Sequence, residues 1–382
     1  MTVRADVLVL GAGPAGSAAA AVLARGGARV VLADRARFPR EKVCGDALLG
    51  DALAALEELG VRRTLDAFAH PVVAMTLSVP TAAAVRLPVA GVVARRERLD
   101  AVLLEHAVAA GARLLSGATL EKLTADAGRF TAATLATADG SVEVSADAFV
   151  LATGAARGPR RLAGLEGRAH RSAAALRGYA RVGGLAADEL QVAFPPDLPG
   201  GYAWAFPCGG GVFNVGCGVF AGGPPRSLAG WLEGYTASLG ATEFEVAPAG
   251  APLLTFFPRG RFALANLAAV GDAAGLTRPL SGEGIGPALV SGIALGRALL
   301  ASPGAAGVAA YRREAVQRWG VEWRAWRFGV AVLRRPGLTH RVVAQAARHE
   351  GARRRCAELL AGTLPAHRVL SPFGLLRLFL GR

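Results

Sequence analysis

Cysteine is scarce in this chain of 382 residues, and the few cysteines lie far apart. No CxxC pair and no cysteine–histidine spacing typical of a zinc site occurs among them. This scarcity excludes a scaffold stapled by disulfides, and we expect a reducing cytoplasmic compartment and no bound metal. The four cysteines are Cys44, Cys208, Cys217 and Cys356.

Charged residues are also few, at 19% against 52% hydrophobic residues, and acidic charge is the rarer kind. This composition excludes a disordered chain and predicts a globular protein of two or three domains. The net charge is +14, but residues 304–382 hold 15 Arg and 4 Glu and so contribute +11. A basic module confined to the C-terminal region argues against a nucleic-acid-binding protein, and we expect no nucleic acid partner.

Long uninterrupted hydrophobic runs of the kind that span membranes are lacking. The longest charge-free stretch, residues 198–225, contains four prolines and alternates with period two, which predicts a sheet segment. The apolar N-terminus is interrupted by Asp6 and by glycines, where a signal peptide would be continuous. It is better interpreted as a strand, a turn and a helix.

A glycine-rich turn follows the first predicted strand, Ala5 to Leu10, and precedes an alanine-rich helix that we expect to reach about Arg25. Such a turn places free backbone N–H groups at a helix N-terminus, where they bind the phosphates of a dinucleotide. A second predicted strand, residues 29–33, ends at Asp34, whose carboxylate we expect to bind the adenosine ribose. The turn residues expected at the dinucleotide are Gly11, Gly13, Pro14, Ala15 and Gly16.

A second glycine-rich segment, residues 269–286, reads AVGDAAGLTRPLSGEGIG. It predicts a strand end, then Asp272 at its mouth, then a loop that leads into a long helix of small residues. Together with the first turn, this segment resembles FAD-dependent oxidoreductases of the para-hydroxybenzoate hydroxylase fold, and more closely the geranylgeranyl reductase family. The resemblance covers roughly the first 300 residues and implies non-covalent FAD.

The resemblance also implies a set of contacts to FAD. The pair Gly271–Asp272 would meet the phosphate and ribityl region, and the loop Gly282 to Ile285, including Gly284, would meet the flavin ring. A helix that begins near Gly284 would direct its positive end at the flavin, where reduction accumulates negative charge. Further residues expected at FAD are Arg35, Lys42, Cys44, Gly45, Arg96, Thr153 and Gly154, with Arg96 on the pyrophosphate.

Cys44 lies in the segment FPREKVCGDAL, which resembles the family's segment near flavin and substrate. A direct catalytic role and a role in lining the pocket both remain open for this thiol, as does a plain small buried side chain. No other residue is assigned as a proton donor, since Tyr202, Cys44 and water all qualify.

An aromatic stripe alternates with alanine at residues 202–206, so Tyr202, Trp204 and Phe206 share one face of a predicted strand. By strand statistics alone this face is half of a sheet core. The stretch also matches the P-x-x-Y-x-W-x-F-P motif of the resembled family, which lines a channel for an isoprenoid chain. On that basis the three side chains are expected to contact substrate, because an uncharged aromatic wall suits a hydrocarbon.

These segments predict an α/β (α+β) chain with two interleaved domains and a C-terminal region. A Rossmann-like FAD domain is expected from residues 1–66, 87–163 and 262–303. An antiparallel substrate sheet is expected from residues 67–86 and 164–261, and a basic helical region from residues 304–382.

The resemblance implies a reductase that transfers hydride from reduced flavin to C=C bonds of a polyprenyl substrate. The alternative is a flavin monooxygenase acting on an aromatic or polyketide-type product; a halogenase and a non-catalytic prenyl carrier are weaker alternatives. Ala156 stands where many hydroxylases of this fold carry an aspartate that couples NADPH to flavin, and no second dinucleotide turn occurs. The electron donor therefore stays open between NADPH, ferredoxin and a separate reductase partner.

The C-terminal region is interpreted as several helices, with Trp319, Trp323 and Trp326 on one face. We expect this face to pack on the FAD domain as a cap. Basic amphipathic helices also bind anionic lipid, so contact with the inner face of the cell membrane is the accompanying hypothesis, with Leu375, Leu376 and Phe379 inserting.

Overall fold

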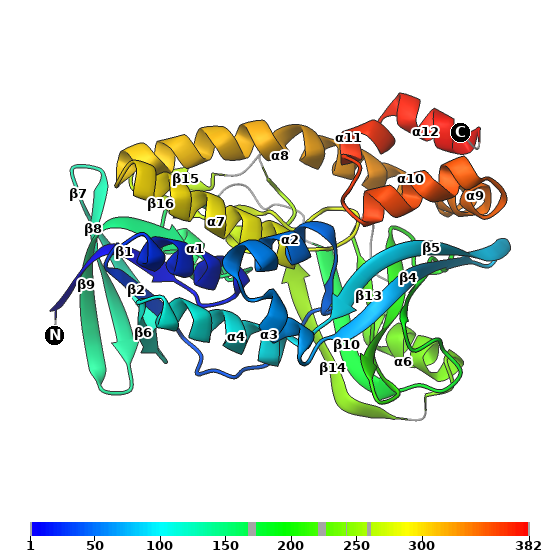
Figure 1. The fold of residues 1–382 in the computed structure, drawn as a ribbon, viewed down its shortest axis with the longest axis horizontal. Helices are drawn as coiled ribbons and strands as arrows, with labels where there is room; N and C mark the ends of the chain where they lie inside the picture. The colour runs from blue at the N-terminus through cyan, green and yellow to red at the C-terminus, as the bar shows by residue number, and fades with distance from the viewer. Residues whose placement is uncertain (1, 167–172, 221–226, 242, 258–260, 381–382) are drawn as a thin grey trace.

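The computed structural model describes residues 2–166, 173–220, 227–241, 243–257 and 261–380, so the end of the charge-free stretch, residues 221–225, lies outside it. Two large sheets lie side by side along the longest axis of the molecule, and the C-terminal helices run across both (Figure 1). The mixture of parallel sheet, antiparallel sheet and helices confirms the predicted fold class.

The first sheet has a parallel core in which β1 lies between β2 and β9. Its strands are near-continuous apolar runs, as expected for strands covered on both faces. The order is β15 (Ala263–Leu264), β16 (Leu267–Ala269), β9 (Gly140–Leu151), β1 (Thr2–Leu10), β2 (Val30–Asp34) and β6 (Arg113–Ser116). The hairpin of β7 (Thr119–Asp126) and β8 (Arg129–Thr137) joins this sheet through β9.

Small residues bring the helices of this domain unusually close together. An ideal Cβ built on Gly292 of α7 would lie 2.2 Å from the carbonyl oxygen of Ala15 in α1, so a glycine is required there. The helices are α1 (Pro14–Arg25), α2 (Gly50–Leu59), α3 (Arg62–Asp66), α4 (Arg96–Ala109), α5 (Arg157–Leu162) and α7 (Ile285–Ala301), with a short 3₁₀ turn at Gly271–Ala274.

The second sheet carries the aromatic stripe on one of its central strands. Its order is β14 (Phe244–Leu253), β10 (Ala173–Arg181), β13 (Val212–Val219), β12 (Gly201–Gly209), β11 (Glu189–Ala193), β4 (His70–Val79), β5 (Ala82–Val93) and β3 (Ala47–Leu48). The helix α6 (Leu228–Ser238) packs on β10 and β13.

Three details of this sheet differ from the sequence-based expectation. The strands β4 and β11 pair in parallel, so the sheet is mixed rather than purely antiparallel. The strand β5 continues to Val93, beyond the boundary expected at residue 86, because it must pair along the full length of β4. β3, from the segment after the Cys44 loop, also joins this sheet.

The C-terminal region is helical, with α8 (Ala305–Leu333), α9 (Pro336–Arg348), α10 (Glu350–Leu360), α11 (Ala366–Val369) and α12 (Pro372–Phe379). Trp319 and Trp323 of α8 are buried with Phe257 in the core of the FAD domain, as a cap requires. Trp326 instead belongs to the apolar core between the second sheet and the later helices, so the expectation that all three tryptophans pack on the FAD domain is wrong for Trp326. The later helices instead cover β4 and β5 of the second sheet (Figure 1). Leu375 is only 7% exposed, so the expectation that it inserts into a membrane is wrong. Among the described residues, no helix combines the length and apolarity needed to cross a bilayer.

Candidate active site

A single large cavity, with a volume of about 1010 Å³, joins the nucleotide side of the first sheet to the inner face of the second sheet. All the residues predicted as cofactor, catalytic or substrate contacts line it, apart from Gly16. Segments that are remote in the sequence therefore converge on one space, as the site predictions require.

The three glycines of the first turn are needed for different reasons. Gly11 has a φ of +105°, and a Cβ on it would lie 2.4 Å from the carbonyl oxygen of Ala152. A Cβ on Gly16 would lie 1.7 Å from the carbonyl oxygen of Gly11, which explains why this residue is buried behind the turn. Gly13 has ordinary extended backbone, and the nearest atom to its missing Cβ is Arg40 Nη2, at 3.6 Å. The protein's own packing does not demand Gly13, so its bare backbone leaves room for a ligand.

Asp34 holds this turn in place from the end of β2. Its Oδ2 accepts a hydrogen bond from the backbone N–H of Ala12 at 2.7 Å, and its Oδ1 accepts one from Ala36 at 2.8 Å. Two buried polar atoms beside the turn have no partner within the described chain, namely Thr153 Oγ1 and Arg40 Nη1. Buried polar groups are normally satisfied, so these two atoms indicate hydrogen bonds to a bound group.

Arg96 makes a different contact from the expected one. Its Nε and Nη2 donate to the two carboxylate oxygens of Asp100, both at 2.7 Å, so the fork is directed at a protein carboxylate. Arg40 also pairs with Asp100, at 3.0 Å, through Nη2, the atom nearest the missing Cβ of Gly13, while its Nη1 is buried without a partner. Both arginines line the cavity, so Arg40 is a second candidate for binding a phosphate, and the contact of Arg96 with the pyrophosphate stays a prediction. Sequence analysis missed Arg40, although it lies in the segment that carries Cys44.

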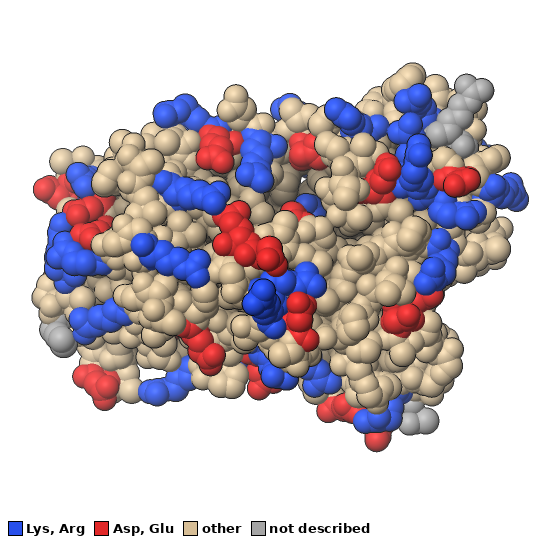
Figure 2. Space-filling view, in the orientation of Figure 1, with Lys and Arg blue, Asp and Glu red and all other residues tan. Residues whose placement is uncertain are grey.

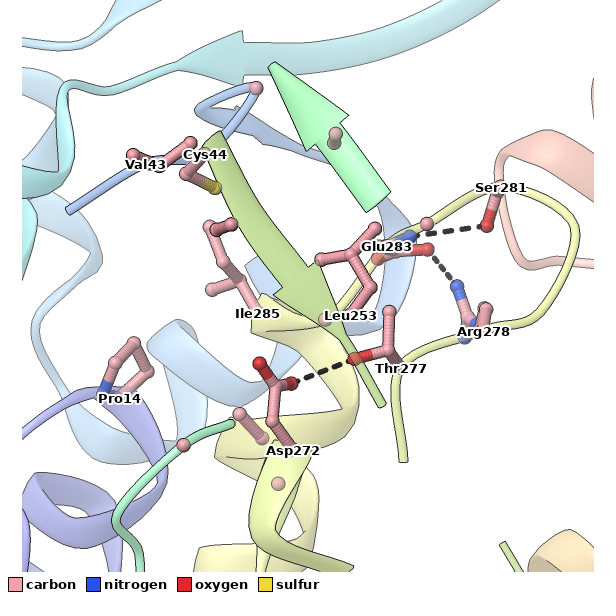
Figure 3. A pocket seen from close by; sticks show the side chains of 18 of the residues that line it. Pro14, Val43, Cys44, Leu253, Asp272, Thr277, Arg278, Ser281, Glu283 and Ile285 are labelled. Atoms are coloured by element: carbon pink, nitrogen blue, oxygen red, sulfur yellow. Dashed lines mark hydrogen bonds and ion pairs between the residues drawn. The ribbon is translucent and has the colours of Figure 1, made fainter. Parts of the chain in front are cut away.

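The second glycine-rich segment forms the wall opposite the turn, with Asp272 and Ile285 directed into the cavity (Figure 3). Asp272 Oδ1 accepts a hydrogen bond from Thr277 Oγ1 at 2.8 Å, which fixes the carboxylate. Gly284 caps the N-terminus of α7, and a Cβ on it would lie 3.2 Å from Asp272 Oδ1. The N-terminus of α7 thus begins at the cavity beside Asp272, and its contact with a flavin stays a prediction.

Cys44 lies on a loop between the two sheets, and the second sheet holds its carbonyl group. Its carbonyl accepts hydrogen bonds from Arg177 Nε at 3.2 Å and from Asn214 Nδ2 at 2.7 Å. Burial raises the pKa of the Cys44 thiol, although Arg96 nearby acts in the opposite direction. The thiol is therefore neutral at physiological pH, which suits pocket lining or proton donation better than nucleophilic attack.

Asp46 is the fully buried centre of the hydrogen-bond network behind that loop. Its Oδ2 accepts from Tyr179 Oη at 2.5 Å and from Asn214 Nδ2 at 2.8 Å. Asn214 Oδ1 in turn accepts from Trp204 Nε1 at 2.9 Å. Burial raises the pKa of Asp46 to about 6, against the opposing hydrogen bonds from Tyr179 and Asn214 and the charge of Arg177. The network links the Cys44 loop to the aromatic stripe.

The aromatic stripe of β12 lies along the cavity, and its rings contact one another. The ring centroids of Tyr202 and Trp204 are 5.9 Å apart, and those of Trp204 and Phe206 are 6.1 Å apart. A Cβ on Gly45 would lie 3.4 Å from the Phe206 ring, so the loop after Cys44 passes directly over the stripe. Ala203 and Ala205 point into the separate core under α6. The alternation therefore puts the aromatic face on the cavity side.

Beyond the stripe, the cavity opens into an apolar chamber between the second sheet and the C-terminal helices. We call this part the apolar chamber, defined by Met75 and Leu77 of β4 and by Trp326, Val342, Val343, Leu359, Leu370, Leu375 and Leu378. The described helices α8 to α12 contribute only uncharged residues to the lining of the cavity. Sequence analysis did not predict that these helices would build a wall of the site, because only the tertiary fold brings them over β4.

Comparisons with known proteins agree with this architecture. The FAD binding domain family matches residues 4–181. A menaquinone reductase of Mycolicibacterium smegmatis is 35% identical over 317 residues, covering 76% of this chain and 75% of that relative. A digeranylgeranylglycerophospholipid reductase of Methanopyrus kandleri is 33% identical over 75% of this chain and 78% of its own length.

Solved structures share the fold over nearly the whole chain. A geranylgeranyl bacteriochlorophyll reductase-like protein from Thermoplasma acidophilum superposes with a TM-score of 0.82 at 21% identity, covering 99% of this chain and 96% of that one. A flavin-dependent brominase superposes with a TM-score of 0.78 at 17% identity, covering 98% of this chain and 97% of its own. At such identities the likeness concerns fold alone.

The glycine turn, the two unpartnered polar atoms and the exposed N-terminus of α7 fit a dinucleotide that carries a flavin. With the family match, they define the chain as an FAD-dependent oxidoreductase of the para-hydroxybenzoate hydroxylase fold. Within that class, the chain belongs to the geranylgeranyl reductase family.

Proposed function

We propose that this enzyme reduces carbon–carbon double bonds in the prenyl chain of a lipid. The observation that carries the proposal is the apolar chamber, from here on the prenyl-side chamber, which continues from the FAD site past the aromatic stripe without a charged residue from the C-terminal helices. An extended hydrocarbon gains free energy from such a lining, whereas a charged metabolite would lose its hydration there. The reductases that this chain resembles carry names of lipids with prenyl chains, which supports the same substrate class.

Each part of the site has a role in this reaction. Reduced FAD supplies a hydride when it is bound. Gly13, Arg40 and Thr153 would hold its phosphate region, and the N-terminus of α7 would stabilise negative charge at its ring. Trp204 and Phe206 position the chain and exclude water, and Cys44 lines the cavity wall beside them.

Anaerobic turnover tests the proposal most directly. The purified enzyme is reduced with dithionite and given menaquinone or a geranylgeranyl lipid, and products are analysed by mass spectrometry. We expect a product that is heavier by one H₂ for each reduced double bond, without oxygen. A strict requirement for oxygen would instead identify a flavin monooxygenase. Absence of bound flavin in the purified protein would favour a non-catalytic prenyl carrier.

A substitution in the chamber tests where the chain lies. Val342 lines the chamber on α9, so Val342→Phe reduces the space for the chain. We expect a long-chain substrate to lose roughly tenfold in kcat/KM and a short-chain substrate to be unaffected, since one misplaced ring costs on the order of 1–3 kcal/mol. The matched control is Val316→Phe on the exposed face of α8. Equal effects on long and short chains would show that the chain does not enter the chamber.

A further inference from the structure

Three charged side chains meet at the point where the FAD side of the cavity joins the prenyl-side chamber. Arg278 Nη2 donates to Asp51 Oδ2 at 2.7 Å, and its Nη1 donates to Glu283 Oε2. Arg278 and Glu283 both line the cavity, and the Arg278 guanidinium lies 5.7 Å from the ring centroid of Trp326 in the chamber wall. Figure 3 shows Glu283 beside Arg278, with a dashed line that joins the two side chains. The guanidinium group of Arg278 therefore donates hydrogen bonds to both carboxyl groups.

The remaining oxygens of the two carboxyl groups face each other and meet no donor. Asp51 Oδ1 and Glu283 Oε1 are both buried without a hydrogen-bond partner. A Cβ on Gly286 would lie 2.4 Å from the first oxygen and 3.0 Å from the second, so both crowd over the same α-carbon. Two ionised carboxylates that both lie against the same α-carbon repel each other. A proton held between the two unpartnered oxygens satisfies both acceptors.

The charged groups around this pair favour one bound proton. Burial raises the pKa of Glu283 to about 7; Arg278 opposes the shift, and Asp51 on α2 reinforces it. Glu322 on α8 also interacts electrostatically with Arg278 and helps to raise the pKa of this arginine. On the cavity side, the titratable group that interacts with Glu283 is Tyr202, whose hydroxyl donates a hydrogen bond to the Ser281 carbonyl. Burial, followed by the charge of Glu283, raises the pKa of Tyr202, so this hydroxyl stays neutral.

The pair also connects two environments. Glu283 lines the cavity with a side chain that is 19% exposed, whereas the Asp51 side chain is 32% exposed and does not line the cavity. Asp51 lies in the first turn of α2, and Glu283 lies directly before α7. The Asp51 side chain is therefore partly accessible from outside the cavity, and the Glu283 side chain from within it.

We propose that Asp51 and Glu283 share one proton beside Arg278 and that Glu283 donates it to the substrate carbon next to the one that receives hydride. The O–H bond of the acid breaks and its electron pair stays on the carboxylate, which Arg278 stabilises. The π pair of the double bond forms the new C–H bond, and the hydride from reduced flavin forms the other. The donation step rests on the proposed function, whereas the shared proton does not.

Glu283 is a better acid for this step than the other candidates in the cavity. Burial raises the pKa of Cys44 and of Tyr202, so both hold their protons tightly at neutral pH. Asp46 also has one oxygen without a partner, Oδ1, but burial raises its pKa only to about 6, so it is mostly ionised at neutral pH, and its Oδ2 is engaged by Tyr179 and Asn214. A general acid works best when its pKa lies near the working pH.

Infrared spectroscopy of the purified protein, with and without FAD, tests the shared proton without any turnover. Near neutral pH we expect the carbonyl stretch of a protonated carboxyl group that disappears in Glu283→Gln. The matched control is Glu58→Gln, because Glu58 on α2 pairs with Arg297 of α7 at 2.7 Å but is exposed. The same band in wild type and Glu283→Gln would overturn the shared proton.

Single-turnover reduction tests donation. In Glu283→Gln we expect the chemical step to slow by roughly 10²-fold and to lose its pH dependence, with FAD content and substrate Kd unchanged. Glu283→Asp keeps a carboxyl group and should retain the pH dependence at an intermediate rate. Asp51→Asn presents an N–H to Glu283, which favours the ionised acid and shifts the pH profile about one unit lower.

The outcomes separate the two proposals. A Glu283→Gln variant that loses the infrared band but reduces prenyl substrates at the wild-type rate overturns donation by Glu283. A wild-type enzyme that shows the band but reduces no prenyl lipid overturns the proposed function and with it the donation step, while the shared proton stands.

Discussion

Gly13 differs from the other glycines of its turn because its missing side chain leaves room that the protein does not use. We predict that Gly13→Trp removes FAD from the purified protein, since the indole would occupy the phosphate position, while the fold persists. Flavin absorbance and thermal unfolding measure the two effects. Gly16→Ala should instead lower the stability itself, because its Cβ would collide with the Gly11 carbonyl. A folded Gly13→Trp protein with stoichiometric FAD would contradict the placement.

Asp46 makes stability depend on pH in a direction opposite to that of most carboxylates. Its pKa is raised from the ordinary 3.8 to about 6 by burial, so the fold favours the neutral acid. The contribution of neutral Asp46 to the free energy of unfolding is fully present below the pKa that Asp46 has in the unfolded chain. This contribution is lost as the pH rises through 6. Two pKa units correspond to about 3 kcal/mol.

The prediction for Asp46 compares two proteins. Between about pH 4 and pH 8 the apo wild-type protein should lose up to about 3 kcal/mol of unfolding free energy relative to Asp46→Asn, measured by denaturant titration. Asparagine keeps an acceptor for Tyr179 and Asn214 but cannot ionise. Parallel pH profiles for the two proteins would show that Asp46 does not titrate in this range.

At the scale of elements, the sequence predicted the parts whose signals are local. The glycine turn, the strand that ends at Asp34 and the helix after Gly284 each depend on a few neighbouring residues, and the structure contains them as β1–α1–β2 and α7. The alternation of Tyr202, Trp204 and Phe206 likewise predicted a shared face. Whether that face was core or cavity wall could not be read from the strand, since the same pattern serves both.

Such local patterns could not predict the contacts between segments that lie far apart in the sequence. Arg40 approaches Gly13 only because the loop after β2 folds back over the turn. Asp51 and Glu283 are separated by more than half the chain, and nothing in either local sequence signals the other. The prenyl-side chamber requires α9 and α10 to lie over β4 and β5, with α11 and α12 packed on α8, α9 and α10, which amphipathic patterns alone do not specify.

Phe206 gives the sharpest test of the aromatic stripe, because Trp204 also bonds Asn214 and its ring contacts Gly216 in the sheet. We predict that Phe206→Ala weakens binding of a prenyl substrate by roughly 2 kcal/mol while FAD occupancy is unchanged. The measurement is substrate Kd beside flavin content. Trp231→Ala, on α6 outside the cavity, is the control and should leave both unchanged. Loss of FAD with normal substrate binding would reverse the assignment of the face.

At the scale of the whole molecule, basic and apolar side chains occur together at one end. Figure 2 shows basic side chains over the end that carries α9, α10 and α12. On that end Phe373, Leu376 and Leu380 are 68%, 53% and 59% exposed, while Leu375 and Leu378 of the same segment line the chamber. The segment thus presents one apolar face to the outside and another to the proposed substrate.

We therefore predict that the protein binds anionic vesicles through this end, with arginines supplying attraction and the three exposed apolar side chains inserting. Vesicle cosedimentation should fall as salt rises, because exposed charges are screened over ~8 Å at physiological ionic strength. Replacing Phe373, Leu376 and Leu380 with serine should weaken binding on the order of a hundredfold without loss of FAD. Leu264→Ser, on exposed β15 at the opposite end, is the control. A deletion of the tail is unsuitable, because it would also open the chamber. If the triple variant binds vesicles as wild type does, the substrate reaches the cavity by another route.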